Sequence, residues 1–309
     1  MSHAGATSQR QQLRVSAPGE IDDPGRRSAL SRIVGSALLA ALPVSHDAEA
    51  AAAAGRLKQS VCHWPYRAVA LPELCRRVRR IGCAGIDLLY MDEWQVAHDA
   101  GLTVSMGYPT RREKFIETGF NDPANHPLLL KELEVALPLA ARAGVPNLIT
   151  MFGNRDPARD DRAAIDSCIA GLAKIAPLAE ESRVTICVEL LNSRIDHPGY
   201  QGDHTAFGVA VMKGVNSPRV KLLYDIYHMQ IMEGDVIRTI RDNIQWIGHF
   251  HTGGVPGRHE IDGSQELNYH AIANAIADQG YTGYLAHEFI PTRADGFVSL
   301  ADAFRICSV

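Results

Sequence analysis

The sequence has no cysteine pair with C-x-x-C spacing, no excess of basic residues and no apolar run long enough to cross a membrane. Its six cysteines are scattered and several lie in apolar segments, so we expect small buried hydrophobic residues rather than a disulfide framework. A net charge of −4 gives no support for a nucleic-acid partner, which normally requires a basic face. With 309 residues, 46% hydrophobic and 21% charged, the chain can form one large core.

The first 55 residues lack the periodicity of a folded domain. Arg26 and Arg27 precede an apolar stretch, residues 33–42, which is too short to span a bilayer, and a small-residue segment at 47–52 offers A-x-A cleavage sites. This order is typical of an export signal, and the paired arginines favour the twin-arginine route although Ala29-Leu30 replaces the usual aromatic. We therefore predict a signal peptide and linker at 1–55, a periplasmic or otherwise exported mature protein, and no membrane anchor after cleavage. An amphipathic or disordered extension on a cytoplasmic protein is the alternative.

From residue 56 to 309 the chain alternates short apolar strands with helices. Eight strands are predicted, at 59–62, 85–90, 102–106, 147–152, 184–189, 220–225, 246–251 and 283–288, separated by segments with helical periodicity. Parallel neighbours require crossover helices, so this order predicts a single-domain α/β fold, the (β/α)8 TIM barrel. An open doubly wound sheet is the competitor, but it usually has a Gly-rich phosphate turn after its first strand, which this sequence lacks.

Four of the predicted strands, the fifth to the eighth, end in residues that bind metals. These are Glu189, Asp225, His251 and Glu288. The carboxyl ends of barrel strands surround the active-site mouth, so the four side chains are expected around one point. Three carboxylates and an imidazole favour Mn²⁺ or Mg²⁺, with Co²⁺ or Zn²⁺ also compatible. Taken singly, each residue also fits a salt bridge or a helix cap.

The residues around these strand ends resemble the hydroxypyruvate isomerase family of xylose-isomerase-like barrels, which also include ketose 3-epimerases and endonuclease IV. The similarity is dense over residues 184–291 and only general over 56–183. It rests on the segments VELLN (188–192), HPGY (197–200), LYDIYHMQIMEG (223–234), IGHFH (247–251), PGRHE (256–260), ELNY (266–269) and GYTG (280–283). The resemblance implies the same four metal ligands. The third is commonly Gln in bacterial hydroxypyruvate isomerases and His in the epimerases, so His251 leaves the substrate open.

The resemblance also implies chemistry. A bound metal would stabilise the enediolate of an α-hydroxy carbonyl substrate while Glu189 and Glu288 move the proton. Hydroxypyruvate and tartronate semialdehyde, or a related sugar, are the expected substrates of such an isomerase. A ketose 3-epimerase and a keto-sugar lyase or dehydratase remain alternatives, and a homo-oligomer is compatible with the sequence. Endonuclease-type cleavage would need more His ligands and DNA contacts, and a sugar-binding module would not need two glutamates on a metal.

Further histidines and an arginine are candidate substrate contacts. His228 and Arg258 occupy positions that contact substrate oxygens in relatives, and Arg258 can offer a forked set of donors. His63 follows the first strand, and His204 precedes a predicted helix where Asp203 or Thr205 could serve as the N-cap. For each of these four side chains the alternative to a substrate contact is an exposed side chain or one stacked on a neighbour. Two further histidines, His249 and His287, are expected to be structural. Four aromatic residues are expected to line either the pocket or the core: Trp64, Tyr108, Phe152 and Tyr200.

Overall fold

The computed structural model describes residues 55–309. The predicted export signal and its cleavage site fall outside this part of the chain. Among the described residues, no helix is both long and apolar enough to cross a membrane.

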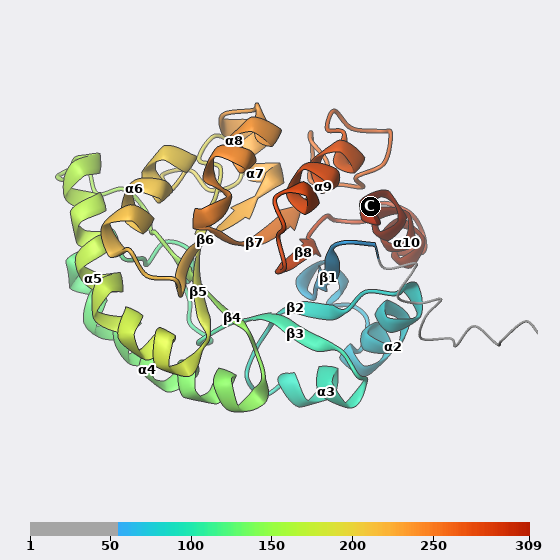
Figure 1. The fold of residues 1–309 in the computed structure, drawn as a ribbon, viewed down its shortest axis with the longest axis horizontal. Coiled ribbons are helices and arrows are strands. Elements are labelled where there is room, and N and C mark those ends of the chain that lie inside the picture. Colours follow the sequence, from blue (N-terminus) through green and yellow to red (C-terminus); the bar gives the residue numbers. More distant parts are fainter. Residues whose placement is uncertain (1–54) are drawn as a thin grey trace, which may run out of the picture. The chain divides into compact units, whose positions relative to one another are not determined.

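Eight parallel strands close into a barrel in chain order, with β1 paired to β8. Figure 1 shows the strands at the centre and the helices around them. The prediction of a TIM barrel is confirmed. The strands are β1 (Lys58–Cys62), β2 (Gly85–Leu89), β3 (Thr103–Gly107), β4 (Asn147–Met151), β5 (Thr185–Leu190), β6 (Val220–Asp225), β7 (Ile247–Thr252) and β8 (Tyr284–His287).

The helices occupy the expected crossovers. In addition, a short helix that the sequence did not predict, residues 226–232, follows β6 directly. Helix 161–182 begins after Asp160, which caps it by accepting a hydrogen bond from Ala163 N–H (2.8 Å). The helices are α2 (Leu71–Ile81), α3 (Trp94–Asp99), α4 (His126–Ala143), α5 (Asp161–Ser182), α6 (Thr205–Val215), α7 (Ile226–Met232), α8 (Val236–Asn243), α9 (Tyr269–Asp278) and α10 (Gly296–Cys307).

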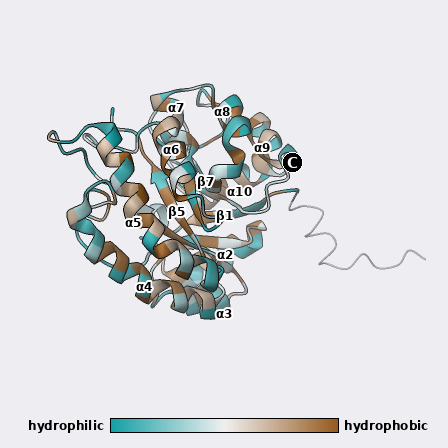
Figure 2. Ribbon diagram, turned by 60° about the vertical axis from the view of Figure 1, so that its left-hand side comes forward, coloured by the Kyte–Doolittle hydropathy of each residue, from teal (hydrophilic) through white to brown (hydrophobic). Residues whose placement is uncertain are grey.

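Hydrophobic residues of the strands and of the inner helix faces form the core. In α2, Leu74, Cys75 and Val78 are fully buried at helical spacing while the arginines between them face outward. Figure 2 shows the same alternation of hydrophobic and hydrophilic residues around α4 and α5. All six cysteines are free and buried; the sequence predicted burial for most of them and left an occasional bridge open.

Strand register determines which side chains meet at the mouth. Asp225 on β6 pairs directly with His251 on β7, and Glu189 on β5 is level with Leu223, one pleat earlier on β6. Thr252, the last residue of β7, pairs with His287, the last residue of β8. Glu288 comes directly after His287 and therefore lies level with the end of β7. The carboxyl ends of β5 to β8 therefore bring four polar side chains to one side of the barrel mouth.

Candidate metal and active site

The four strand-end residues converge as the sequence predicted. Glu189, Asp225, His251 and Glu288 each offer a ligand atom, and these atoms lie within 4.8 Å of one another. Their exposed fractions are 5%, 0%, 0% and 4%. Three carboxylates buried this closely repel one another and lose hydration. A bound divalent cation would compensate both effects, which makes the cluster a suitable metal site.

His251 is oriented so that one ring nitrogen faces the carboxylates and the other is occupied. Its Nε2 lies 2.8 Å from Oδ2 of Asp87, a buried residue of β2. Its Nδ1 lies 2.7 Å from Glu288 Oε2 and 3.4 Å from Glu189 Oε1, but makes no hydrogen bond in the described structure. An imidazole that donates Nε2–H to a carboxylate leaves the Nδ1 lone pair free to bind a metal. The orphaned Nδ1 therefore fits the proposed ion.

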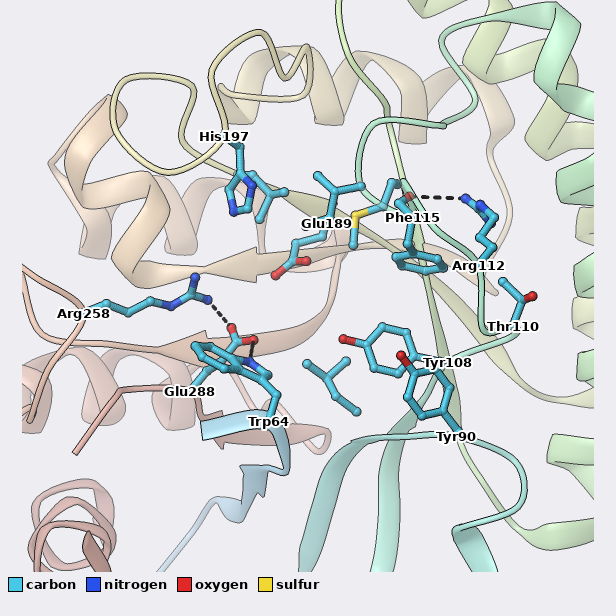
Figure 3. Close-up of a pocket in the computed structure, with 14 residues that line it drawn as sticks. Trp64, Tyr90, Tyr108, Thr110, Arg112, Phe115, Glu189, His197, Arg258 and Glu288 are labelled. Carbon is cyan, nitrogen blue, oxygen red and sulfur yellow. Dashed lines mark hydrogen bonds and ion pairs between the residues drawn. The ribbon is translucent and has the colours of Figure 1, made fainter. Parts of the chain in front are cut away.

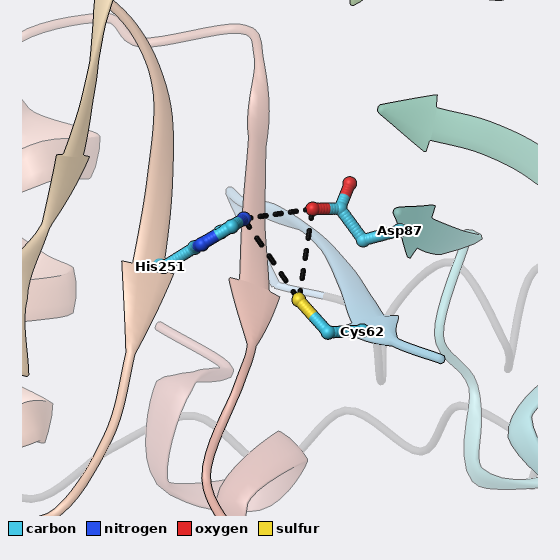
Figure 4. Close-up of side chains that lie close together, drawn as sticks. All are labelled: Cys62, Asp87 and His251. Atoms are coloured by element: carbon cyan, nitrogen blue, oxygen red, sulfur yellow. Dashed lines mark hydrogen bonds and ion pairs between the residues drawn. The ribbon is translucent and has the colours of Figure 1, made fainter. Parts of the chain in front are cut away.

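Asp87 is the centre of a polar network beneath the site. Its Oδ2 also lies 3.1 Å from His249 Nε2 and 3.7 Å from Cys62 Sγ, while Ser105 donates to its other oxygen. Figure 4 shows Cys62, Asp87 and His251 meeting between their strands. Burial alone raises the pKa of Asp87, but His249 and His251 more than offset this and hold the pKa well below its usual value. Asp87 is thus ionised and fixes the ring of His251.

Asp225 caps a helix and also faces the cluster. Its Oδ1 accepts hydrogen bonds from the N–H groups of Tyr227 (2.8 Å) and His228 (3.4 Å) at the start of α7. Its Oδ2 accepts from Arg258 Nη2 at 3.1 Å. Burial raises the pKa of Asp225 to about 7, against the lowering effect of Arg258. The sequence left helix capping and metal binding as alternatives for Asp225. In the structure Oδ1 caps α7, whereas Oδ2 faces the cluster, so one carboxylate can serve both roles.

The two glutamates have different surroundings. Glu288 accepts hydrogen bonds from Trp64 Nε1 (2.6 Å) and Arg258 Nη2 (2.6 Å). Burial raises its pKa, but Arg258 and His251 outweigh burial and hold it well below its usual value. Burial is also the largest influence on Glu189, and its pKa is raised. Two carboxyls whose pKa values are pushed apart are suited to different proton-transfer roles.

Arg258 is held in place by the loop between β7 and α9. Its backbone is in the left-handed region (φ 58°), which costs a non-glycine residue on the order of 1 kcal/mol. Ile290 N–H donates to its carbonyl (2.7 Å), and two residues later Glu260 accepts hydrogen bonds from Thr292 N–H (2.7 Å) and from Ser299 Oγ (2.8 Å). These contacts attach the loop to the connection after β8 and direct the guanidinium between Asp225 and Glu288.

A cavity of about 330 Å³ opens above the cluster. Figure 3 shows Glu189, Glu288 and Arg258 on one side and the aromatic rings of Tyr90, Tyr108 and Phe115 on the other. This volume lies at the lower end of the range that encloses small-molecule ligands, roughly 300–1,000 Å³. Glu189, Glu288 and Arg258 thus lie at one end of the cavity, and the other end is mainly aromatic, with Thr110 and Arg112 beside the rings.

The four predicted substrate contacts are not equivalent. Arg258 lines the cavity, whereas His228 is fully buried beneath it, with Nδ1 2.7 Å from Asn192 Nδ2 and Nε2 3.4 Å from Asp225 Oδ2. His63 lies 4.0 Å from Glu93 and does not line the cavity. His204 contacts Asp203 (2.8 Å) beside a separate surface hollow near Arg155. The structure therefore brings only Arg258 of this group into the cavity lining.

Of the four aromatic residues for which the sequence left pocket and core open, two are core residues. Phe152 packs edge-on against Phe207 and is fully buried, and the Tyr200 hydroxyl donates to the Glu189 carbonyl (2.9 Å). Trp64 and Tyr108 do line the cavity. His249 is a buried, hydrogen-bonded core residue as expected. His287 is likewise buried outside the barrel interior, 3.0 Å from Gln59 Oε1 and 3.1 Å from Thr252 Oγ1.

A family model described as "Xylose isomerase-like TIM barrel" matches residues 74–306. The chain belongs to this family. The match covers the strands β2 to β8, and with them all four candidate ligands.

Relatives of this xylose isomerase-like barrel carry isomerase names. A human protein named "Putative hydroxypyruvate isomerase" is 29% identical over 238 residues, covering 72% of this chain and 85% of that one. The 2-oxo-tetronate isomerase of Cupriavidus necator is 38% identical over 136 residues, 44% of this chain and 52% of that one. The predicted resemblance to the hydroxypyruvate isomerases is confirmed. Among solved structures, the family 2 AP endonuclease from Brucella melitensis superimposes with a TM-score of 0.68 at 25% identity, covering 79% of this chain and 97% of that one.

Three contributors to the site were missed from the sequence. Asp87 orients His251, Trp64 donates to Glu288 rather than only forming a wall, and His197 lines the cavity beside Glu189. Asp87 had a visible signal, a carboxylate inside an otherwise apolar strand. His197 stands in the HPGY segment of the xylose isomerase-like barrel, where the sequence offered a resemblance but no geometry.

Proposed function

We propose that this protein is a metal-dependent isomerase that interconverts an α-hydroxy aldehyde and a ketone. Hydroxypyruvate with tartronate semialdehyde, or a related small sugar, is the proposed substrate pair. The observation that carries the proposal is the buried convergence of Glu189, Asp225, His251 and Glu288 at the mouth of the barrel. The isomerase names of the relatives described above support the same reaction class.

Glu189, Asp225, His251 and Glu288 would hold one divalent ion, Mn²⁺ or Mg²⁺ by the preference of carboxylate oxygens. Co²⁺ or Zn²⁺ would also be accepted by a site with an imidazole. Such an ion, when bound, supplies positive charge that polarises the substrate carbonyl and stabilises negative charge on its oxygens.

The protein's own residues divide the proton transfer. Glu189, whose pKa is raised by burial, is suited to exchanging a proton with the carbon that bears the hydroxyl. Glu288 stays ionised because Arg258 stabilises its charge, with Trp64 fixing one oxygen, and it faces the same cavity as the partner group. Arg258 offers donors to substrate oxygens. His228 and Asn192 support the Asp225 side of the site from below.

Return of the proton to the opposite face of the same carbon would give a ketose 3-epimerase instead. His251 favours this second candidate, because the epimerases of the superfamily commonly have His at the third ligand position. A keto-sugar lyase would use the same groups and release an unsaturated product.

Turnover in D₂O with added Mn²⁺ separates these reactions. Hydroxypyruvate, ketoses of four to six carbons and 3-keto-sugars would be incubated in turn, and products followed by NMR. An isomerase gives a product in which the carbonyl has moved to the neighbouring carbon and the former carbonyl carbon carries solvent deuterium. An epimerase leaves the carbonyl where it was and places deuterium on the inverted carbon beside it. An unsaturated product identifies the lyase. Absence of solvent label from every substrate and product would refute the proposed proton transfer.

We also propose that residues 1–55 direct export through the twin-arginine route. Sequencing the N-terminus of protein recovered from the periplasm tests this. A mature chain starting near residue 56 is expected, and intact protein confined to the cytoplasm would contradict it.

A further inference from the structure

A second hollow lies at the opposite end of the barrel from the mouth. Its volume is about 500 Å³, and six strands begin at its rim, β1 and β4 to β8. Residues on the amino-terminal face of a TIM barrel normally serve stability rather than catalysis. This hollow belongs to no part of the proposed active site.

Three cationic side chains line this hollow, and no acidic residue does. Lys58 comes from β1, Lys221 from β6, and Arg219 from the turn before β6. None of the three forms an ion pair with a carboxylate within residues 55–309. Nearby like charges repel, and an anion between them would relieve this repulsion.

The cations instead contact neutral groups. Lys221 Nζ donates to the Gln245 carbonyl at 2.8 Å, and Arg219 Nη1 donates to Thr185 Oγ1 at 3.3 Å. Burial lowers the pKa of Lys221, as expected for a partly desolvated ammonium without a counter-charge. Each cation retains further N–H donors, because an ammonium has three and a guanidinium five.

The loop before β8 adds backbone donors to the same wall. Thr282 and Gly283 line the hollow, and their N–H groups donate to no acceptor among the described residues. Tyr281 and Tyr284 lie beside them, and Pro146, Ile244 and Ile247 form apolar parts of the wall. The hollow thus combines hydrogen-bond donors and positive charge in its lining with an apolar surface larger than a bare anion requires.

We propose that this hollow is a binding site for a small organic phosphate with a planar or apolar body. Lys58, Arg219 and Lys221 bind the phosphate, since charged donors recognise phosphate oxygens strongly, and the tyrosine and proline side of the wall receives the organic part. Because the strands that carry Glu189, Asp225, His251 and Glu288 begin here, occupancy of the site stabilises the same barrel that holds the catalytic end.

Isothermal titration of the full-length, metal-loaded protein with phenyl phosphate tests the proposal, with inorganic phosphate in parallel. We expect one binding equivalent, weakened by added salt, and an increase in melting temperature. Lys221→Met and Arg219→Gln are each expected to weaken binding about tenfold or more, as charged hydrogen bonds are lost. Arg80→Gln, which removes an exposed cation from α2, is the matched control and should bind as the parent does.

Arg258→Gln distinguishes this hollow from the mouth. Phenyl phosphate binding that survives this change and is lost in Lys221→Met or Arg219→Gln supports the proposal. Binding lost in Arg258→Gln, binding unaffected by both hollow variants, or no binding at millimolar concentration would overturn it. If either Lys221→Met or Arg219→Gln fails to fold, phenyl phosphate binding to the other variant tests the proposal.

Discussion

Replacing Asp87 by Asn should weaken metal binding without removing any of the four candidate ligands. Asp87 Oδ2 lies 2.8 Å from His251 Nε2 and 3.1 Å from His249 Nε2. An Asn in its place keeps a similar shape but loses the charge, and its amide group can turn an N–H toward the imidazoles. The His251 tautomer with a proton on Nδ1 then becomes competitive, and that proton points at the metal position.

The expected size of the effect follows from the role of such partners. Loss of a carboxylate behind a metal-bound imidazole typically costs 10–100-fold in metal affinity, about 1.4–2.7 kcal/mol. Because the four candidate ligands remain, saturating Mn²⁺ should restore most of the turnover. The apparent metal affinity should therefore change more than the maximal rate.

The assay is a Mn²⁺ titration of metal-depleted protein against a competing chelator, repeated with activity as the signal. Ser105→Ala is the control, since it removes the hydrogen bond to the other Asp87 oxygen and leaves both imidazoles in place. It should lower metal affinity a few-fold at most. Thermal unfolding without metal shows whether Asp87→Asn folds. A folded Asp87→Asn protein with the metal affinity of the parent would refute this role of Asp87.

Further predictions concern proton transfer, the indole and the loop. Glu189→Gln should abolish solvent-deuterium exchange into substrate, and Glu288→Gln should do the same while also weakening metal binding; exchange at the parent rate in either would contradict the assignment. Trp64→Phe removes the 2.6 Å donor to Glu288 but keeps an aromatic wall, so we expect a lower maximal rate with little change in the melting temperature. Hydrogen bonds from Thr292 and Ser299 outweigh burial and lower the Glu260 pKa to about 2, so at neutral pH the ionised form adds on the order of 1–2 kcal/mol, after solvent screening, to the free energy of unfolding. This contribution is complete above pH about 4.5 and is lost as pH falls toward 2. In urea unfolding, Glu260→Gln should therefore have a lower free energy of unfolding than the parent at pH 7, and that free energy should change less between pH 4.5 and 2. The same free energy and pH profile as the parent would contradict this role of Glu260.

The barrel and its four-residue cluster were predictable because both depend on local pattern. Strand periodicity located β5 to β8, and each of the four cluster residues lies within one residue of the carboxyl end of its strand, which is at the barrel mouth. Asp225 shows the limit of this reasoning. A cap and a ligand are alternatives in the sequence, and only atomic positions reveal that its two oxygens serve separately. Helix α7 was missed for a related reason, since it starts at its own cap with no loop to mark it.

Contacts between distant strands were beyond the sequence. Asp87 is separated from His249 and His251 by 162 and 164 positions, and only closure of the barrel brings β2 and β7 to the same interior layer. His204 and His63 were plausible by position along the chain, yet each lies beside a nearby carboxylate and outside the cavity lining. Side-chain direction in a loop depends on the neighbours it meets, which a single sequence does not specify.

Metal content measured together with activity tests the central claim most directly. Purified protein would be analysed for divalent ions by mass spectrometry, stripped with chelator, assayed with its substrate and reloaded. We expect about one ion per chain in active protein, loss of isomerisation on removal and recovery on adding Mn²⁺ or another divalent ion, with Asp225→Asn retaining less than the parent. Full isomerase activity in protein that contains no divalent ion would contradict it.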